Sequence, residues 1–90
     1  MSNETYLNHP AFGLLYQICL LDDQKEIFTT LYAQRLFFLV ETTRTKTHFE
    51  PITRSDAKLL IENRLRFLRR TGDFKSYEIL VNLYKGTFQK

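Results

Sequence analysis

Cysteine and glycine are scarce in this chain of 90 residues, which has one of the former and three of the latter. The lone Cys19 cannot build a disulfide framework or a cysteine-rich zinc site, which is typical of a protein from a reducing compartment. The glycines stand apart at positions 13, 72 and 86, so the chain has no glycine-rich phosphate-binding loop.

Long apolar runs are absent as well. None approaches the roughly 18 to 20 residues that a bilayer-spanning helix needs. The first ten residues, MSNETYLNHP, lack the basic-then-apolar pattern of a secretory signal. We therefore expect a cytoplasmic protein that makes no membrane contact.

Catalytic and metal-binding motifs are also missing. His9 and His48 are far apart in the sequence, and neither belongs to a metal-ligand spacing such as HxxxH or HExxH. Asp22 and Asp23 are adjacent, but in a charged surface turn they lack the buried setting that catalytic carboxylate pairs use. The sequence thus predicts a binding protein that is not an enzyme and holds no metal or cofactor.

The residues that are present divide the chain into two parts. Hydrophobic residues make up 43% of the chain and aromatic residues 14%, as in ordinary globular domains. The net charge of +3 is uneven, because residues 1–52 carry four basic and six acidic side chains, whereas residues 53–90 carry nine and four. Strand patterns fill the first part and helix patterns the second. We expect an α+β fold, with a β domain over residues 1–53 and a helical part over residues 54–90.

The first part predicts several short antiparallel strands. We expect them at 11–21, 27–40 and 48–52, separated by a charged hairpin connection at 22–26 and a polar loop at 41–47. Residues 27–40 are too many for one ordinary strand, so a turn or bulge is expected near Tyr32 and Ala33. Pro51 is expected to end the last strand. Four or five such strands favour a small barrel of the SH3 or Tudor kind.

The second part predicts a helical hairpin. Ser55 is a plausible N-cap of the first helix, Asp56 suits its first turn, and Gly72 suits a left-handed stop. Asp73 can then cap a second helix. The expected apolar stripes consist of Leu60, Ile61, Leu65 and Leu68 in the first helix, and of Phe74, Tyr77, Val81, Tyr84 and Phe88 in the second.

Two candidate contact surfaces follow from these patterns. In LYAQRLFFLV, residues 31–40, both faces of a strand would be apolar, so one face needs a cover. The face with Tyr32, Gln34, Leu36 and Phe38, flanked by Arg35, either binds a partner protein or lies under the helices. A basic group, made up of Arg64, Arg66, Arg69 and Arg70, either contacts nucleic acid or complements the helix dipole and nearby acidic residues.

Three long motifs carry a resemblance to a known family. YLNHPAFGLLYQICLLDD, FTTLYAQRLFFLV and FEPITRSDAKLLIENRLRFLRRTG together resemble the PipX family of small cyanobacterial proteins, which interact with the nitrogen signalling protein PII. The resemblance extends from Glu4 to about Gly72, and the motifs are long enough to be specific. Departures lie in ETTRTKTH, which lacks the family's proline and glycine, and in the last helix.

The resemblance implies a Tudor-like domain followed by two helices, and a protein, monomeric when free, that exchanges between two partners. PII would hold it when 2-oxoglutarate is scarce, and the CRP-type activator NtcA would bind it when 2-oxoglutarate is abundant. Other transcription regulators stay open as further partners, and direct binding of nucleic acid is not expected. The implied partner-binding residues are Glu4, Tyr6, Phe12, Asp23, Tyr32, Gln34, Arg35, Leu36 and Phe38.

Overall fold

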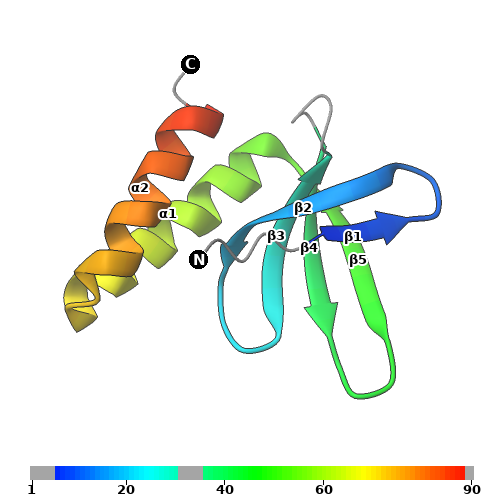
Figure 1. The fold of residues 1–90 in the computed structure, drawn as a ribbon, viewed down its shortest axis with the longest axis horizontal. Helices are drawn as coiled ribbons and strands as arrows, with labels where there is room; N and C mark the ends of the chain where they lie inside the picture. Colours follow the sequence, from blue (N-terminus) through cyan, green and yellow to red (C-terminus); the bar gives the residue numbers. More distant parts are fainter. Residues whose placement is uncertain (1–5, 31–35, 89–90) are drawn as a thin grey trace.

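The computed structural model describes residues 6–30 and 36–88, which form a curled antiparallel sheet followed by two helices (Figure 1). The elements are β1 (Tyr6–His9), β2 (Gly13–Leu20), β3 (Lys25–Thr30), β4 (Phe37–Thr42), β5 (Thr47–Ile52), α1 (Arg54–Thr71) and α2 (Phe74–Phe88). The strands lie in the sheet in their sequence order, so β1 and β5 are its edges. The sheet curls into a half-barrel, and the two helices lie side by side against one of its faces. The expected α+β fold is confirmed.

The start of the sheet differs from the expectation. A strand was expected from residue 11, but Ala11 and Phe12 lie in the turn between β1 and β2, which pair with His9 opposite Gly13. Gly13 has a φ of 77°, a left-handed conformation that glycine adopts without steric cost, and it makes this tight turn possible. The four residues of β1 were not predicted, because so short a strand has little periodic signal.

The long stretch 27–40 is divided between two strands, as expected. β3 ends at Thr30 and β4 begins at Phe37, while the expected turn near Tyr32 and Ala33 falls outside the described residues. Pro51 does not end the last strand as expected, but lies within β5 opposite Phe38. Proline is tolerated there because β5 is an edge strand, in which one row of backbone groups has no neighbouring strand to bond.

The ends of α1 and the start of α2 are explained by local residues. The N-cap of α1 is Thr53 rather than Ser55: its Oγ1 accepts a hydrogen bond from the amide of Asp56 at 2.9 Å, and the Asp56 carboxylate accepts one from the Thr53 amide at 3.3 Å. This reciprocal capping box satisfies two amides and therefore outcompetes Ser55. Gly72 ends α1 with a φ of 84°, and Asp73 accepts from the amide of Ser76 at 3.2 Å, so both of these predictions are confirmed.

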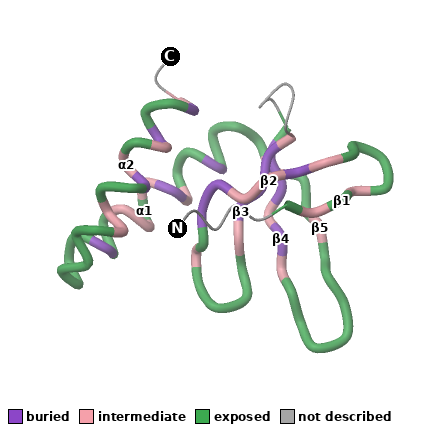
Figure 2. Tube along the Cα trace, viewed as in Figure 1, coloured by how far each residue is buried: buried purple, intermediate pink, exposed green. Residues whose placement is uncertain are grey.

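The apolar side chains form two separate clusters, one on each face of the sheet. The cluster between sheet and helices is made up of Ile18, Cys19, Ile27, Phe37, Ala57, Ile61, Leu68, Leu80 and Tyr84. The cluster on the concave face is made up of Leu15, Phe28, Phe38 and Val40. Because side chains alternate along a strand, the neighbours Phe37 and Phe38 enter opposite clusters. Figure 2 shows the buried segments in the sheet and along the helices, with exposed turns around them.

A bulge in β2 adjusts the helix-covered face. The register between β2 and β3 shifts between Gln17 and Cys19, and both Ile18 and Cys19 are buried in the cluster beneath the helices. The extra residue of a bulge lets two consecutive side chains serve the same face. This bulge was not predicted from the sequence.

The end of α2 is tied to α1 and to the sheet. The Phe88 ring stacks on Phe37 with centroids 5.6 Å apart, and the Arg54 guanidinium lies 5.0 Å from the Phe88 centroid. Arg54 also donates to the carbonyl oxygen of Thr87 at 3.1 Å.

At the other end of α2, Phe74 is 64% exposed, so its expected place in the apolar stripe is wrong. Phe74 begins the helix at the tip of the hairpin, away from the sheet (Figure 1).

Candidate partner-binding surface

Four rings close the concave face of the sheet at one end, and we call this group the aromatic mouth: His9, Phe12, Phe38 and Phe49. His9 comes from the end of β1, Phe12 from the turn that follows, Phe38 from β4 and Phe49 from β5. The His9 centroid lies 5.0 Å from Phe12, 5.3 Å from Phe38 and 5.0 Å from Phe49. Because β1 and β5 are the two edges of the sheet, the ring contact between His9 and Phe49 joins these edges.

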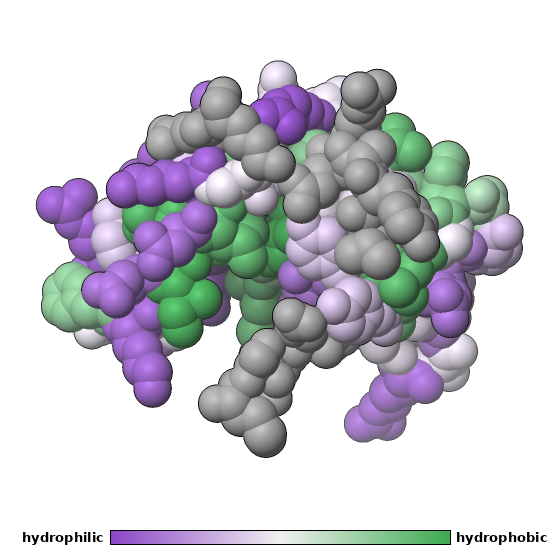
Figure 3. Space-filling view, turned by 45° about the horizontal axis from the view of Figure 1, so that its top comes forward, coloured by the Kyte–Doolittle hydropathy of each residue, from purple (hydrophilic) through white to green (hydrophobic). Residues whose placement is uncertain are grey.

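Phe12 is the exposed member of the mouth. Its centroid lies 5.4 Å from that of Phe38, yet 47% of Phe12 is exposed. A large aromatic side chain that is supported from below and open above is typical of protein interfaces. Figure 3 shows apolar side chains at the end of the molecule that carries the β1–β2 hairpin, whereas hydrophilic side chains dominate over the helices.

Tyr6 and Leu36 lie at the two ends of one row of residues that crosses the sheet. A row of paired residues crosses four strands from Tyr6 through Tyr16 and Thr29 to Phe37, which directly follows Leu36. The carbonyl oxygen of Leu36 accepts from the hydroxyl of Thr29 at 2.9 Å and fixes the residue beside β3. Tyr6 is 44% exposed and Leu36 is 45% exposed, so both are accessible to a partner.

Phe38, which the resemblance implies as a partner-binding residue, is buried. Only 2% of it is exposed, so it supports Phe12 from below but presents no free ring to a partner. The reason is the alternation in β4, which turns Phe38 into the concave cluster. The sequence left open whether a partner protein or the helices cover this face of residues 31–40. Phe38 is instead covered by the barrel itself.

Asp23 lies apart from the other implied residues. It is exposed in the turn between β2 and β3, whereas Phe12 precedes the opposite end of β2. The other four implied residues lie outside the described part of the chain: Glu4, Tyr32, Gln34 and Arg35. The described residues thus place Tyr6, Phe12 and Leu36 on exposed parts of the sheet and its turns, and separate Asp23 from Phe12.

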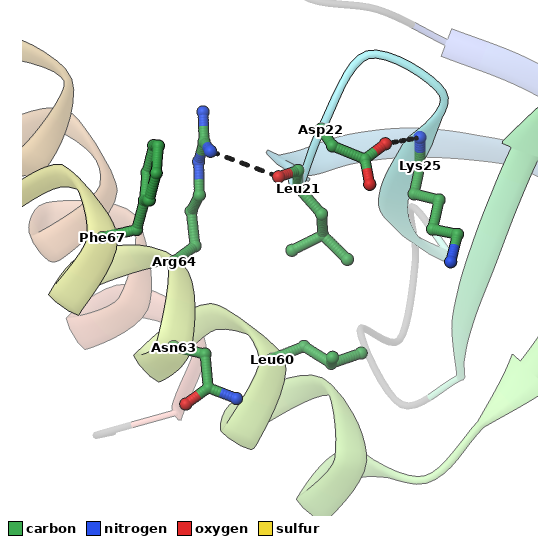
Figure 4. Close-up of a pocket in the computed structure, with 7 residues that line it drawn as sticks. All are labelled: Leu21, Asp22, Lys25, Leu60, Asn63, Arg64 and Phe67. Carbon is green, nitrogen blue, oxygen red and sulfur yellow. Dashed lines mark hydrogen bonds between the residues drawn. The ribbon is translucent and has the colours of Figure 1, made fainter.

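A groove borders the same β2–β3 turn on its helix side (Figure 4). It encloses about 440 Å³ between the turn and α1, and its residues are Leu21, Asp22, Lys25, Leu60, Asn63, Arg64 and Phe67. The Arg64 guanidinium donates to the carbonyl oxygen of Leu21 at 3.2 Å and lies 4.9 Å from the Phe67 centroid. Arg64 is therefore a structural link between helix and hairpin.

The carboxylate of Asp22 organises this turn. Its Oδ1 accepts hydrogen bonds from the amides of Gln24 at 2.8 Å and Lys25 at 2.9 Å. The bond from Gln24 is the main cause of a lowered pKa of Asp22, and the charges of Lys25 and Arg64 lower it further. Asp22 is thus held in its ionised form by its own turn.

The basic residues of α1 do not form one patch. At about 100° per residue, Arg66, Arg69 and Arg70 share one face of the helix, whereas Arg64 points to the hairpin. Arg66 donates to the side chain of Asn63, and Arg69 and Arg70 are exposed in the last turn. Arg69 and Arg70 are placed to complement the negative end of the helix dipole.

The described residues 6–30 and 36–88 give little support to metal binding or to a reactive thiol. Within them no three His, Cys, Asp or Glu side chains are grouped so that they could hold a metal ion. Cys19 is buried, and burial raises the pKa of its thiol to about 12, against a smaller opposing effect of Arg64. No helix in this part of the chain is long and apolar enough to cross a membrane.

Sequence reasoning missed two members of the aromatic mouth, His9 and Phe49. His9 was considered only as a metal ligand, because β1 was not recognised as a strand. The alternation of Leu7 and His9 opposite Leu15 and Gly13 is the signal that places both toward the concave side. Phe49 was assigned to a strand but to no site, although it follows the same rule in β5.

One comparison with known proteins found a match. A family model described as PipX, PII-interacting protein X, matches residues 3–88, which is nearly the whole chain. A comparison with curated proteins found none. The match includes the strands that carry the aromatic mouth and both helices.

Proposed function

The chain belongs to the PipX family, and from this we propose that it is a regulatory adaptor that binds the signalling protein PII. The observation that carries the proposal is the family match over residues 3–88, whose description names PII as the partner. The half-exposed side chains of Tyr6, Phe12 and Leu36 support it, because a partner could bury them. The adaptor is monomeric when free and performs no catalysis.

The proposal includes a second partner and a metabolite signal. PII holds the adaptor when 2-oxoglutarate is scarce and releases it when 2-oxoglutarate is abundant, and the released adaptor then binds and stabilises the active form of the CRP-type activator NtcA. By linkage, an adaptor that prefers active NtcA raises the affinity of NtcA for its effector by the same factor by which the effector raises the affinity for the adaptor. This part rests on the resemblance alone.

The partner-binding surface is proposed to lie in residues 1–53. Tyr6, Phe12 and Leu36 are its described contacts, with Phe38 as support beneath Phe12. It further includes Glu4, Asp23, Tyr32, Gln34 and Arg35. The helices α1 and α2 cover the opposite face of the sheet, and α1 carries the basic group Arg64, Arg66, Arg69 and Arg70.

Surface plasmon resonance with immobilised PII tests the proposal. Binding with ADP that disappears with ATP and 2-oxoglutarate is the expected result. Replacing Tyr32 by Ala should weaken binding by about 2 kcal/mol or more, because a rigid aromatic anchor is lost. Circular dichroism of that variant must remain native, since an unfolded variant would assign Tyr32 to the core. Absence of binding in both nucleotide conditions would contradict the proposal.

A second candidate function is nucleic-acid binding through the basic face of α1. The observation in its favour is that Arg66, Arg69 and Arg70 share one exposed face. It predicts an affinity for duplex DNA or RNA that falls steeply with salt and is lost when these three arginines are neutralised. Under the adaptor proposal the same substitutions matter less for PII binding than Tyr32→Ala does.

A further inference from the structure

The turn between β1 and β2 is held by a side chain. His9 pairs with Gly13 across the hairpin, and Pro10, Ala11 and Phe12 form the turn between them. Pro10 has no amide hydrogen, so the first two amides that the turn offers are those of Ala11 and Phe12. Both donate to Nδ1 of His9, at 3.0 Å and 3.3 Å. The imidazole thus binds the turn that carries the exposed Phe12.

This geometry defines the role of Nδ1. It accepts the hydrogens of both amides, so this position needs an acceptor atom to hold the turn. Asn and Asp use a side-chain oxygen in the same way to bind amides two and three residues ahead.

The same ring also holds the hairpin to the rest of the barrel. It lies 5.3 Å from the Phe38 centroid and 5.0 Å from that of Phe49, which belong to β4 and β5. Around the ring, β4 and β5 therefore present aromatic rings. The titratable neighbours of Phe49, His48 and Glu50, point to the other face of β5 by strand alternation.

We infer that His9 is the positioning residue of the partner-binding surface. Its Nδ1 fixes the turn, and its ring holds that turn over Phe38. Phe12 is thereby presented to a partner. The inference rests on the proposed function, because it assumes that PII binds through Phe12.

Three variants separate the acceptor from the ring. His9→Asn keeps an acceptor for the turn, His9→Phe keeps a ring but has no acceptor, and His9→Ala has neither. In surface plasmon resonance, His9→Phe and His9→Ala should bind PII about ten-fold more weakly than the unmodified chain, whereas His9→Asn should stay within about three-fold.

The inference would be overturned if His9→Phe bound PII within about two-fold of the unmodified chain. Nitrogen-15 spectra of each variant report whether the rest of the fold is native.

A second readout does not depend on PII. Hydrogen exchange at the amides of Ala11 and Phe12 should be slow in the unmodified chain and in His9→Asn, and fast in His9→Phe. Slow exchange in His9→Phe would overturn the role of Nδ1. If the unmodified chain shows the protected amides but binds no PII, then the proposed function fails while the turn geometry stands.

Discussion

Both faces of the sheet bury apolar side chains, but the two faces are covered in different ways. On the outer face α1 and α2 form a layer, and Phe37 beneath it is 1% exposed. On the concave face the sheet closes on itself through the rings of His9 and Phe49, and Phe12 at the rim remains 47% exposed. A layer of helices buries the side chains beneath it, whereas a rim of side chains leaves those at the edge of the core accessible. The same apolar chemistry therefore serves stability on one face and, under the proposed function, recognition on the other.

The largest effect on stability is expected when a ring is removed from the helix-covered face. Phe37→Ala should lower the free energy of unfolding by about 3–5 kcal/mol, because it leaves a cavity beneath the helices and removes the stack on Phe88. Urea denaturation followed by circular dichroism measures the loss. A loss below about 1 kcal/mol would mean that the helices do not depend on this face.

A ring at the rim should show the opposite balance. Phe12→Ala should weaken PII binding by about 2 kcal/mol while costing less than that in stability, because nearly half of the side chain is already exposed. Phe74→Ala is the matched control, since Phe74 is 64% exposed but lies on the tip of the helical hairpin. Equal effects of the two substitutions on PII binding would contradict a specific role of the mouth.

Alkaline pH should loosen the helix-covered face selectively. Burial raises the pKa of Cys19 from 9.0 to about 12, and a hydrogen bond at 2.5 Å from the Tyr84 hydroxyl to Glu62 raises the pKa of Tyr84. Both groups bind their protons more tightly in the folded state, so the stability they contribute is lost as pH rises through their raised pKa values. For Cys19 the contribution is complete below pH 9 and is lost as pH rises toward 12. The loss should be at most about 1.4 kcal/mol per pH unit for each group.

Urea titrations at several alkaline pH values measure this slope. Cys19→Ala and Tyr84→Phe remove the two ionisations in turn, and each variant should show a smaller slope than the unmodified chain. A slope that neither substitution changes would show that other groups govern alkaline unfolding.

The smallest effect is expected at the junction between the two parts of the chain. Thr53→Ala removes the acceptor of the Asp56 amide and should cost about 1 kcal/mol of stability. Ser55→Ala should cost much less, because Ser55 is not the cap. PII binding should be unaffected by either substitution, since the cap serves α1 and not the aromatic mouth. A greater cost at Ser55 than at Thr53 would contradict the observed capping box.

Much of the fold was predictable from local signals. The change of pattern near residue 53 predicted strands followed by helices, and Gly72 and Asp73 predicted the turn of the helical hairpin, because caps and stops depend on a few neighbouring residues. Prediction was poorer where two signals competed. Thr53 and Ser55 are both good cap residues, and only the reciprocal bond with Asp56 decides between them.

The candidate site was less predictable. The sequence indicated that residues 36–40 are apolar on both faces, but it could not say that Phe38 enters the barrel while Leu36 remains accessible. Nor could it show that His9 and Phe49, forty residues apart in the chain, meet at the two edges of the sheet. Contacts of that kind depend on the curl of the whole sheet, because alternation within one strand gives the face of a side chain but not its partner on a distant strand.

By itself, the sequence determined the order of strands and helices, the positions of most turns and, through the motifs that match its family, the partner to test first. Propensity, capping and family resemblance are all written in contiguous residues. The tertiary structure decided which apolar residues became core and which became surface, because exposure depends on what packs above a side chain. For this reason Phe37, Phe38 and Phe12 have different roles although their side chains are the same.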